Sequence, residues 1–110
     1  MALRHEIGTL GESLAERFLV ERGYKLIERN ARVAGDELDL IVAHGSTIVA
    51  VEVKTTSNGA DPFEAVDDDK MFRIRRAADA YRLRVDRIDV IAVTITDAGA
   101  SIHWVQAMGS

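Results

Sequence analysis

The chain has 110 residues, of which 47% are hydrophobic and 29% are charged, and its formal net charge is −4. This length is too short for two domains, so we expect one globular domain spanning residues 1–110. The absence of cysteine excludes a disulfide framework and a thiolate metal site. The N-terminal segment lacks the apolar run of a signal peptide, and no segment approaches the roughly 20 apolar residues of a membrane span. We therefore expect a cytoplasmic location and no membrane partner.

The net charge hides a basic segment in the second half of the chain. Residues 70–87 contain seven basic and two acidic side chains, a local charge of +5. A basic segment on an acidic body can bind a phosphate backbone, although the same pattern is typical of a solvated helix face. Charge alone leaves both interpretations open.

The first predicted element is a helix at residues 4–22, where apolar residues recur at helical spacing. Gly23 follows directly and is a residue that commonly ends a helix. We expect the apolar stripe of this helix to comprise Ile7, Leu10, Leu14 and Phe18, widened by Ala15 and Leu19.

Five strands and a second helix follow. Apolar and β-branched residues predict strands at residues 24–32, 37–43, 47–55, 87–95 and 101–107. Between the third and fourth strands, Asp67, Asp68 and Asp69 open a helix, where acidic residues suit the positive end of the helix dipole. Its apolar seam is formed by Met71, Ile74, Ala78 and Tyr81.

The order αβββαββ predicts an α/β fold. The second, third and fourth strands are apolar on both faces, which is typical of strands that helices cover on both sides. We therefore expect a mixed β-sheet flanked by helices, with residues 101–107 as an extra C-terminal edge strand.

The connection between the second and third strands predicts their register. Gly45 and Ser46 form a two-residue hairpin signal, because glycine supplies the positive φ that a type II′ turn needs. In the resulting register the numbers of paired residues sum to 91, so that Ile41 faces Ala50.

This register brings charged side chains together, with Asp39 opposite Glu52 and Glu37 opposite Lys54. Directly opposed residues lie about 5 Å apart on one face of a sheet, so two carboxylates should meet and repel each other. Protonation of one acid, an ion pair with Lys54 or a bound cation would each neutralise them. Two carboxylates, waters and substrate phosphate oxygens suit Mg²⁺, and Lys54 could orient or deprotonate a water.

Four motifs carry a resemblance to a known family: "GESLAERFLVERGYKLIERNAR", "DELDLIV", "VEVK" and "DPFEAVDDDKMFRIRRAADAY". They resemble the YraN-like family of small uncharacterised bacterial proteins. That family is similar to the PD-(D/E)XK nucleases, particularly the archaeal Holliday junction resolvases. The resemblance runs from Gly11 to about Val93 and implies a restriction-endonuclease-like αβββαβ core in a single nuclease-like domain.

The resemblance implies roles for individual residues. Asp39 and Glu52 stand where the family's metal-binding acids stand, and Val53 would lend its backbone carbonyl to the metal. Lys54 matches the lysine of the E-x-K element, and Glu12 matches an acid in the first helix of resolvase-like members. The implied catalytic set is therefore Asp39, Glu52, Lys54 and Glu12.

Auxiliary roles are implied nearby. Glu37 matches the first acid of the family's "GEIDLI" pattern, and we expect it to pair with Lys54 or to touch the edge of the site. Lys70 matches a lysine of the second helix and is expected to contact phosphate together with Arg73 and Arg76. An ordinary exposed helix lysine is the alternative interpretation of Lys70.

The function implied by the resemblance is a Mg²⁺- or Mn²⁺-dependent endonuclease that hydrolyses phosphodiester bonds of nucleic acid, with DNA favoured over RNA. Branched DNA is one candidate substrate, and because resolving it needs two active sites, a homodimer is expected in that case. Two alternatives remain open: a non-cleaving nucleic-acid-binding module of the same fold, and an interaction protein whose charged cluster is only structural.

Overall fold

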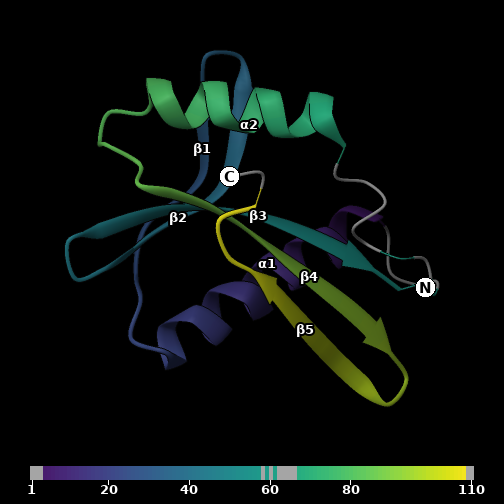
Figure 1. Cartoon of the computed structure of the whole chain (residues 1–110). Coiled ribbons are helices and arrows are strands. Elements are labelled where there is room, and N and C mark those ends of the chain that lie inside the picture. The colour runs from purple at the N-terminus through teal and green to yellow at the C-terminus, as the bar shows by residue number, and fades with distance from the viewer. Residues whose placement is uncertain (1–3, 58, 60, 62–66, 109–110) are drawn as a thin grey trace.

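The computed structural model of the chain describes residues 4–57, 59, 61 and 67–108 (Figure 1). Within this part, two helices and five strands follow in the predicted order αβββαββ, and their ends lie within two residues of the predicted ones. The elements are α1 (Arg4–Glu21), β1 (Lys25–Val33), β2 (Asp36–His44), β3 (Thr47–Thr56), α2 (Asp68–Ala80), β4 (Arg87–Thr96) and β5 (Gly99–Val105).

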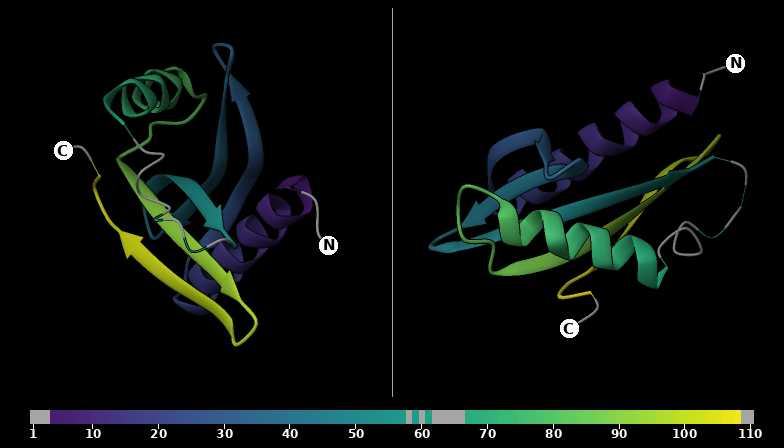
Figure 2. Two further views of the ribbon diagram at one scale, coloured as in Figure 1. Left: turned by 90° about the vertical axis from the view of Figure 1, so that its right-hand side faces the viewer. Right: turned by 90° about the horizontal axis from the view of Figure 1, so that it is seen from above.

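The strands form one mixed sheet in the order β1-β2-β3-β4-β5. Neighbouring strands are antiparallel except β3 and β4, which are parallel and joined through α2. The two helices cover opposite faces of the sheet (Figure 2), and β5 lies at one edge. The predicted mixed sheet with a C-terminal edge strand is confirmed.

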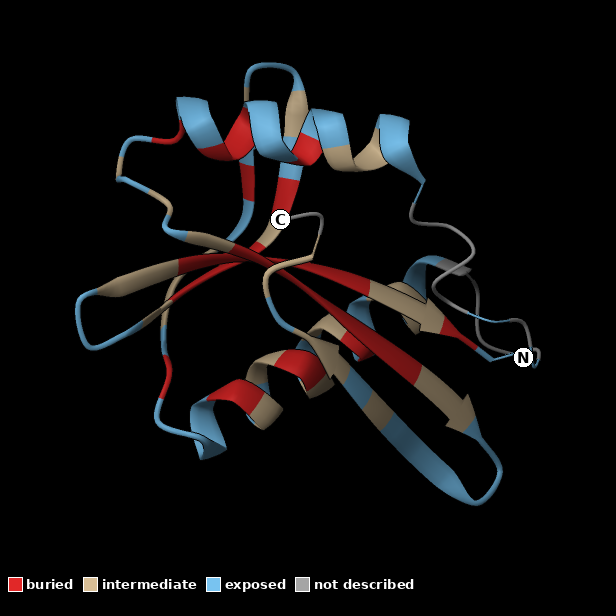
Figure 3. Ribbon diagram, in the orientation of Figure 1, coloured by how far each residue is buried: buried red, intermediate tan, exposed pale blue. Residues whose placement is uncertain are grey.

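Two hydrophobic clusters, one beneath each helix, explain why the inner strands are apolar on both faces. Ala15 and Leu19 of α1 pack with residues such as Val51, whereas Ile74 of α2 packs with residues such as Ala50. The buried residues concentrate along the middle of β3 and β4 (Figure 3). Each fully buried aliphatic side chain contributes about 1.5–3 kcal/mol, so the sheet is held from both sides.

Helix α1 faces the sheet with a row that the sequence did not fully predict. Gly11, Ala15 and Leu19, spaced by four residues, are buried, whereas Leu10 is 48% exposed. Placing Leu10 in the apolar stripe was therefore wrong, because the helix is turned so that a glycine meets the sheet there. No helix in the described part of the chain combines the length and the apolar character needed to cross a membrane.

Gly11, which has no side chain, lets α1 approach β3 closely. A side-chain carbon added at Gly11 would collide with the side chain of Thr55. At the other end, Gly23 has a φ of +90° and ends the helix as predicted. Its N–H donates to the Val20 carbonyl at 3.0 Å, and the Tyr24 N–H donates to the Leu19 carbonyl at 3.1 Å, which is the Schellman arrangement.

The hairpin between β2 and β3 has the predicted register, but it opens early. Paired residues run from His44 and Thr47 to Leu40 and Val51, and all follow the predicted sum. Gly45 has a φ of +61°, as a type II′ turn requires. Beyond Leu40 the pairing stops, so the expected direct pairs of Asp39 with Glu52 and of Glu37 with Lys54 do not form.

Past this point the two strands separate. The first residues of β2 pair with β1 as far as Asp36, whereas the last residues of β3 pair with β4 as far as Thr56. The hairpin of β1 and β2 therefore turns away beside α2 while β3 continues with β4 (Figure 1). We call this opening between Asp39 and Glu52 the fork.

Candidate active site

Asp39 and Glu52 occupy the two sides of the fork. The Glu52 side chain is only 5% exposed, and Asp39 is half-buried. The Val53 N–H donates to Asp39 Oδ2 at 2.8 Å, which takes the place of the missing strand pairing. Because the N–H and C=O of a strand residue point to the same side, the Val53 carbonyl also faces the fork.

The surroundings of Asp39 disfavour its charge. Burial, reinforced by the negative charge of Glu52, raises the pKa of Asp39 to about 8. Glu12 adds to this rise, while the hydrogen bond from Val53 and the charge of Lys54 oppose it. Asp39 and Glu52 therefore interact as the sequence register implied, although they are not direct strand partners.

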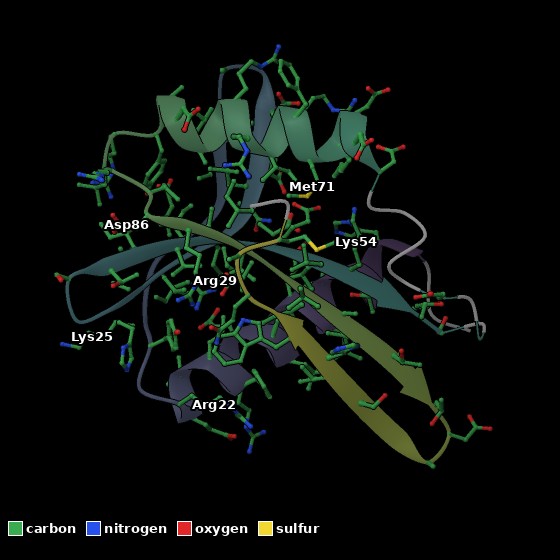
Figure 4. All side chains as sticks on the ribbon, in the orientation of Figure 1. Arg22, Lys25, Arg29, Lys54, Met71 and Asp86 are labelled. Atoms are coloured by element: carbon green, nitrogen blue, oxygen red, sulfur yellow. The ribbon has the colours of Figure 1, made fainter. Side chains whose placement is uncertain are left out.

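Two lysines balance the charge of Glu52. Lys54 Nζ lies 3.1 Å from Glu52 Oε1, and Lys70 Nζ, from α2, lies 3.5 Å from the same oxygen. Lys54 projects from β3 into the space beneath α2, on the side where Met71 lies (Figure 4). Of the three predicted ways to neutralise the acids, the protein's own groups combine two: an ion pair at Glu52 and a raised pKa at Asp39.

The fork opens into a pocket of about 190 Å³ between β2, β3 and α2. Among the described residues, its charged lining groups are four acids and two bases. Ion pairs at Asp36 and Glu52 and the raised pKa of Asp39 balance much of the acidic charge. Among the residues that the structure describes, Arg73 makes no ion pair, and its charge is available to a ligand. The lining residues are Asp36, Glu37, Asp39, Glu52, Lys70, Arg73 and Ile74.

A third acid reaches the site from the opposite face of the sheet. Glu12 follows Gly11, whose close approach to β3 brings this part of α1 to the fork. The Asn30 amide donates to Glu12 Oε1 at 3.0 Å and to Glu37 Oε1 at 2.9 Å. Glu37 therefore lies at the edge of the site, and its alternative pairing with Lys54 was wrong.

The basic residues of α2 divide into two groups. Lys70 and Arg73 line the pocket, whereas Arg76 Nη2 pairs with Asp36 Oδ2 at 2.9 Å. Arg76 is therefore held at the rim by an acid of β2. The phosphate contacts expected of these three residues stay predictions.

The oxygen groups at the fork fit a hard divalent cation. Asp39 and Glu52 offer carboxylates, and Val53 offers a carbonyl, which are the ligand types that Mg²⁺ and Mn²⁺ prefer. Within residues 4–57, 59, 61 and 67–108, no three acidic or histidine side chains converge as a ready-made metal cage. Water and substrate phosphate oxygens would have to complete the shell, as is common for Mg²⁺.

Sequence reasoning missed two features. Asn30, with a φ of +52°, bridges two acids from the middle of β1. Asparagine is one of the few residues that tolerate this conformation, so the asparagine in "ERNAR" was a signal inside an otherwise regular strand. The second feature is a buried aspartate, Asp89 of β4, which the apolar pattern around it concealed.

Asp89 is fully buried and saturated with donors. Arg87 donates to both of its oxygens at 2.8 and 2.9 Å, Trp104 Nε1 donates at 3.0 Å and the Ala107 N–H donates at 2.9 Å. The ring of Trp104 also meets that of Tyr24 edge-to-face, with centroids 5.7 Å apart. This network joins β4 to β5. We interpret it as a structural feature that is separate from the fork.

Comparisons with known proteins place the chain in a family. The model of the uncharacterised protein family UPF0102 matches residues 11–93. A UPF0102 protein of Beutenbergia cavernae is 44% identical over 92% of this chain and 92% of its own length. UPF0102 proteins of Dictyoglomus turgidum and Nocardioides sp. are 35% and 38% identical, and each alignment covers at least 88% of both chains. The YraN-like family expected from the sequence motifs is thereby confirmed, and the chain belongs to the uncharacterised protein family UPF0102.

Proposed function

We propose that the protein is a Mg²⁺- or Mn²⁺-dependent endonuclease that hydrolyses phosphodiester bonds in nucleic acid, with DNA as the expected substrate. One observation carries the proposal: Asp39 and Glu52 face each other across the fork, with the Lys54 ammonium 3.1 Å from Glu52. The likeness of the sequence motifs to PD-(D/E)XK nucleases supports the same conclusion.

The carboxyl groups of the pocket explain why a cation would bind before the phosphate of a substrate. Among the described lining residues, carboxyl groups outnumber basic groups four to two, and a bound cation would bridge such groups to a phosphate. A cation held by Asp39, Glu52 and the Val53 carbonyl would replace the proton on Asp39 and add positive charge to the fork. In that role it would polarise a phosphoryl oxygen and lower the pKa of an attacking water.

The side chains around the fork divide the remaining work. Lys54 lies where it can orient the attacking water or stabilise negative charge on the phosphate. Arg73, which has no acidic partner among the described residues, is suited to hold a substrate phosphate. Lys70 can exchange its contact with Glu52 for a phosphate oxygen when a cation takes over that carboxylate.

The test is cleavage of labelled single-stranded, duplex and four-way DNA with Mg²⁺, Mn²⁺ or chelator. We expect cleavage that needs the divalent cation, and a loss of about 100-fold or more in Glu52→Gln, because ligand loss exceeds the 10–100-fold typical of outer partners. Asp97→Asn, a change at an exposed turn acid, is the matched control and should cleave like the parent. Equal cleavage by Glu52→Gln and the parent would refute the proposal.

A second candidate is a nucleic-acid-binding module that does not cleave. The observation that favours it is the double ion pair of Glu52 with Lys54 and Lys70, which neutralises this acid without a cation. It predicts DNA binding without cleavage in any divalent cation. If three phosphates are contacted, the logarithm of affinity should fall with the logarithm of salt with a slope of about −2.7.

A further inference from the structure

We propose that Asn30 is a positioning residue of the site, whose neutral side-chain amide fixes the carboxylates of Glu12 and Glu37 beside Asp39 without cancelling their charge. The inference rests on the proposed function, because carboxylates held in place serve a bound cation. Nothing in the sequence motifs assigns this role to Asn30.

The position of Asn30 in the sheet is the first argument. In the pairing of β1 with β2, Arg29 pairs with Leu40 and Ala31 pairs with Leu38. The pair between them, Asn30 with Asp39, is missing. Asn30 instead adopts a φ of +52°, so the ladder is interrupted directly opposite Asp39 on the β1 side, as it also ends next to Asp39 on the β3 side.

The chemistry of the contacts is the second argument. The Asn30 nitrogen donates to Glu12 at 3.0 Å and to Glu37 at 2.9 Å, so one amide group joins acids from α1 and β2. The Asn30 nitrogen, and not its oxygen, faces both acids, as suits the carboxylate oxygens that accept these hydrogen bonds. A lysine or arginine in place of Asn30 would neutralise the two acids, whereas the asparagine amide only restrains them. Glu37 has a cation nearby, but the Arg32 side chain is largely exposed and its Nη2 lies 3.8 Å from Glu37 Oε2.

The competing explanation is that Asn30 only permits the left-handed backbone. Asn30→Gly distinguishes the two explanations, because glycine adopts this φ without strain but has no side-chain amide to donate a hydrogen bond. If Asn30 acts through its amide, the Gly variant should fold normally and lose function. If only the backbone matters, the Gly variant should match the parent in every respect.

The experiment compares the parent, Asn30→Gly and Ala34→Gly, which removes a side chain at a second left-handed position of the same hairpin (φ +53°). Mn²⁺ binding is measured by titration calorimetry, folding by thermal melts in chelator, and cleavage on the three DNA substrates. For Asn30→Gly we expect both the Mn²⁺ affinity and the cleavage rate to fall by about 10–100-fold. That loss is typical of residues that orient metal ligands. Ala34→Gly should bind and cleave like the parent.

A double-mutant cycle identifies the acid through which Asn30 acts. In a Glu12→Gln background, the effect of Asn30→Gly on Mn²⁺ affinity should shrink, because the partner it positions is already altered. An unchanged effect in this background and in Glu37→Gln would overturn the positioning role. A merely structural role predicts a lower melting temperature with no change in Mn²⁺ affinity.

The outcomes separate the two proposals. A parent that binds Mn²⁺ and cleaves, together with an Asn30→Gly variant that does both equally well, refutes the role of Asn30 and leaves the proposed function standing. A parent that neither binds Mn²⁺ nor cleaves any substrate refutes the proposed function, and the role of Asn30 falls with it.

Discussion

Asp39 and Asp89 are both aspartates on strands of one sheet, yet their surroundings are opposite. Asp89 is fully buried, and Arg87, Trp104 and the Ala107 backbone donate four hydrogen bonds to it. Asp39 accepts a hydrogen bond from Val53 but faces the charge of Glu52, and its pKa is raised to about 8. Burial alone therefore does not show whether an acid stabilises the folded protein, because the sign of its contribution depends on its neighbours.

The largest effect is expected on the saturated side of this comparison. Asp89→Asn turns an amide toward the donors of Arg87 and Trp104 and leaves the guanidinium without its carboxylate. We expect a loss of about 3–5 kcal/mol of unfolding free energy, typical of breaking a buried pair. For a chain of this length that corresponds to a melting temperature lower by roughly 12–20 °C. A melt within two or three degrees of the parent would show that the network is not structural.

The approach of α1 to the fork gives the next largest effect. In Gly11→Ala the new methyl group collides with Thr55, so we expect a loss of about 1–3 kcal/mol although alanine favours helices. Gly8→Ala is the matched control, because nothing lies within 4 Å of a side-chain carbon there, and it should gain about 0.5–1 kcal/mol. Denaturant unfolding measures both changes, and equal effects of the two substitutions would contradict the close packing.

The same Asp-to-Asn substitution at Asp39 should raise the free energy of unfolding, whereas at Asp89 it should lower it. Asp39→Asn replaces a carboxyl group that must take up a proton on folding at neutral pH by a neutral amide, whose oxygen can still accept from the Val53 N–H. We expect the variant, melted with chelator at neutral pH, to be more stable by about 1 kcal/mol or more, since each pKa unit corresponds to about 1.4 kcal/mol. Mn²⁺ should stabilise the parent and leave the variant unchanged. A variant that melts lower would indicate an ordinary structural ion pair.

The pH dependence of stability sharpens this prediction. Between the unfolded pKa of about 4 and the folded pKa of about 8, the folded protein holds a proton on Asp39 that the unfolded chain has lost. The contribution of Asp39 to stability therefore falls as pH rises through this window and is constant above it. We expect the stability of the parent minus that of Asp39→Asn to decline from pH 4 to pH 8. A flat difference would show that Asp39 is ionised throughout.

The smallest effect is expected at Ala34, which contacts neither Asp39 nor Asp89 and serves as a reference for the other substitutions. Ala34 and Gly35 have φ values of +53° and +84° in the turn between β1 and β2, a conformation that asparagine tolerates better than alanine. Ala34→Asn should gain about 0.5–1 kcal/mol in thermal melts. Mn²⁺ should shift this variant as much as it shifts the parent.

Local signals explain what could be predicted from the sequence. The glycine in the turn at Gly45 specified the hairpin register, and the continuous apolar runs of the inner strands specified coverage on both faces. The candidate acids Asp39 and Glu52 followed from that register, because a turn and two adjacent strands are close in sequence. Each of these inferences needs only a short segment of chain.

What could not be predicted depends on segments far apart in sequence. The fork forms because β2 stays with β1 while β3 stays with β4, a competition between pairings that no single segment reveals. Asp89 looked anomalous only once Trp104 and Arg87 were in place around it. The exposure of Leu10 likewise depends on how Gly11 meets Thr55, which is a matter of packing rather than of helical periodicity.

The hydrogen bond from Val53 to Asp39 has a spectroscopic consequence. Most amides in the middle of a sheet report on strand pairing, but the Val53 amide points into the fork and is held by a side chain. Its nitrogen and proton chemical shifts should therefore change when Asp39 gains a proton or a ligand, while amides deeper in the β3 ladder stay still. A single resonance of the backbone thus reports whether Asp39 holds a proton or a ligand, and it can be read in solution without any substrate.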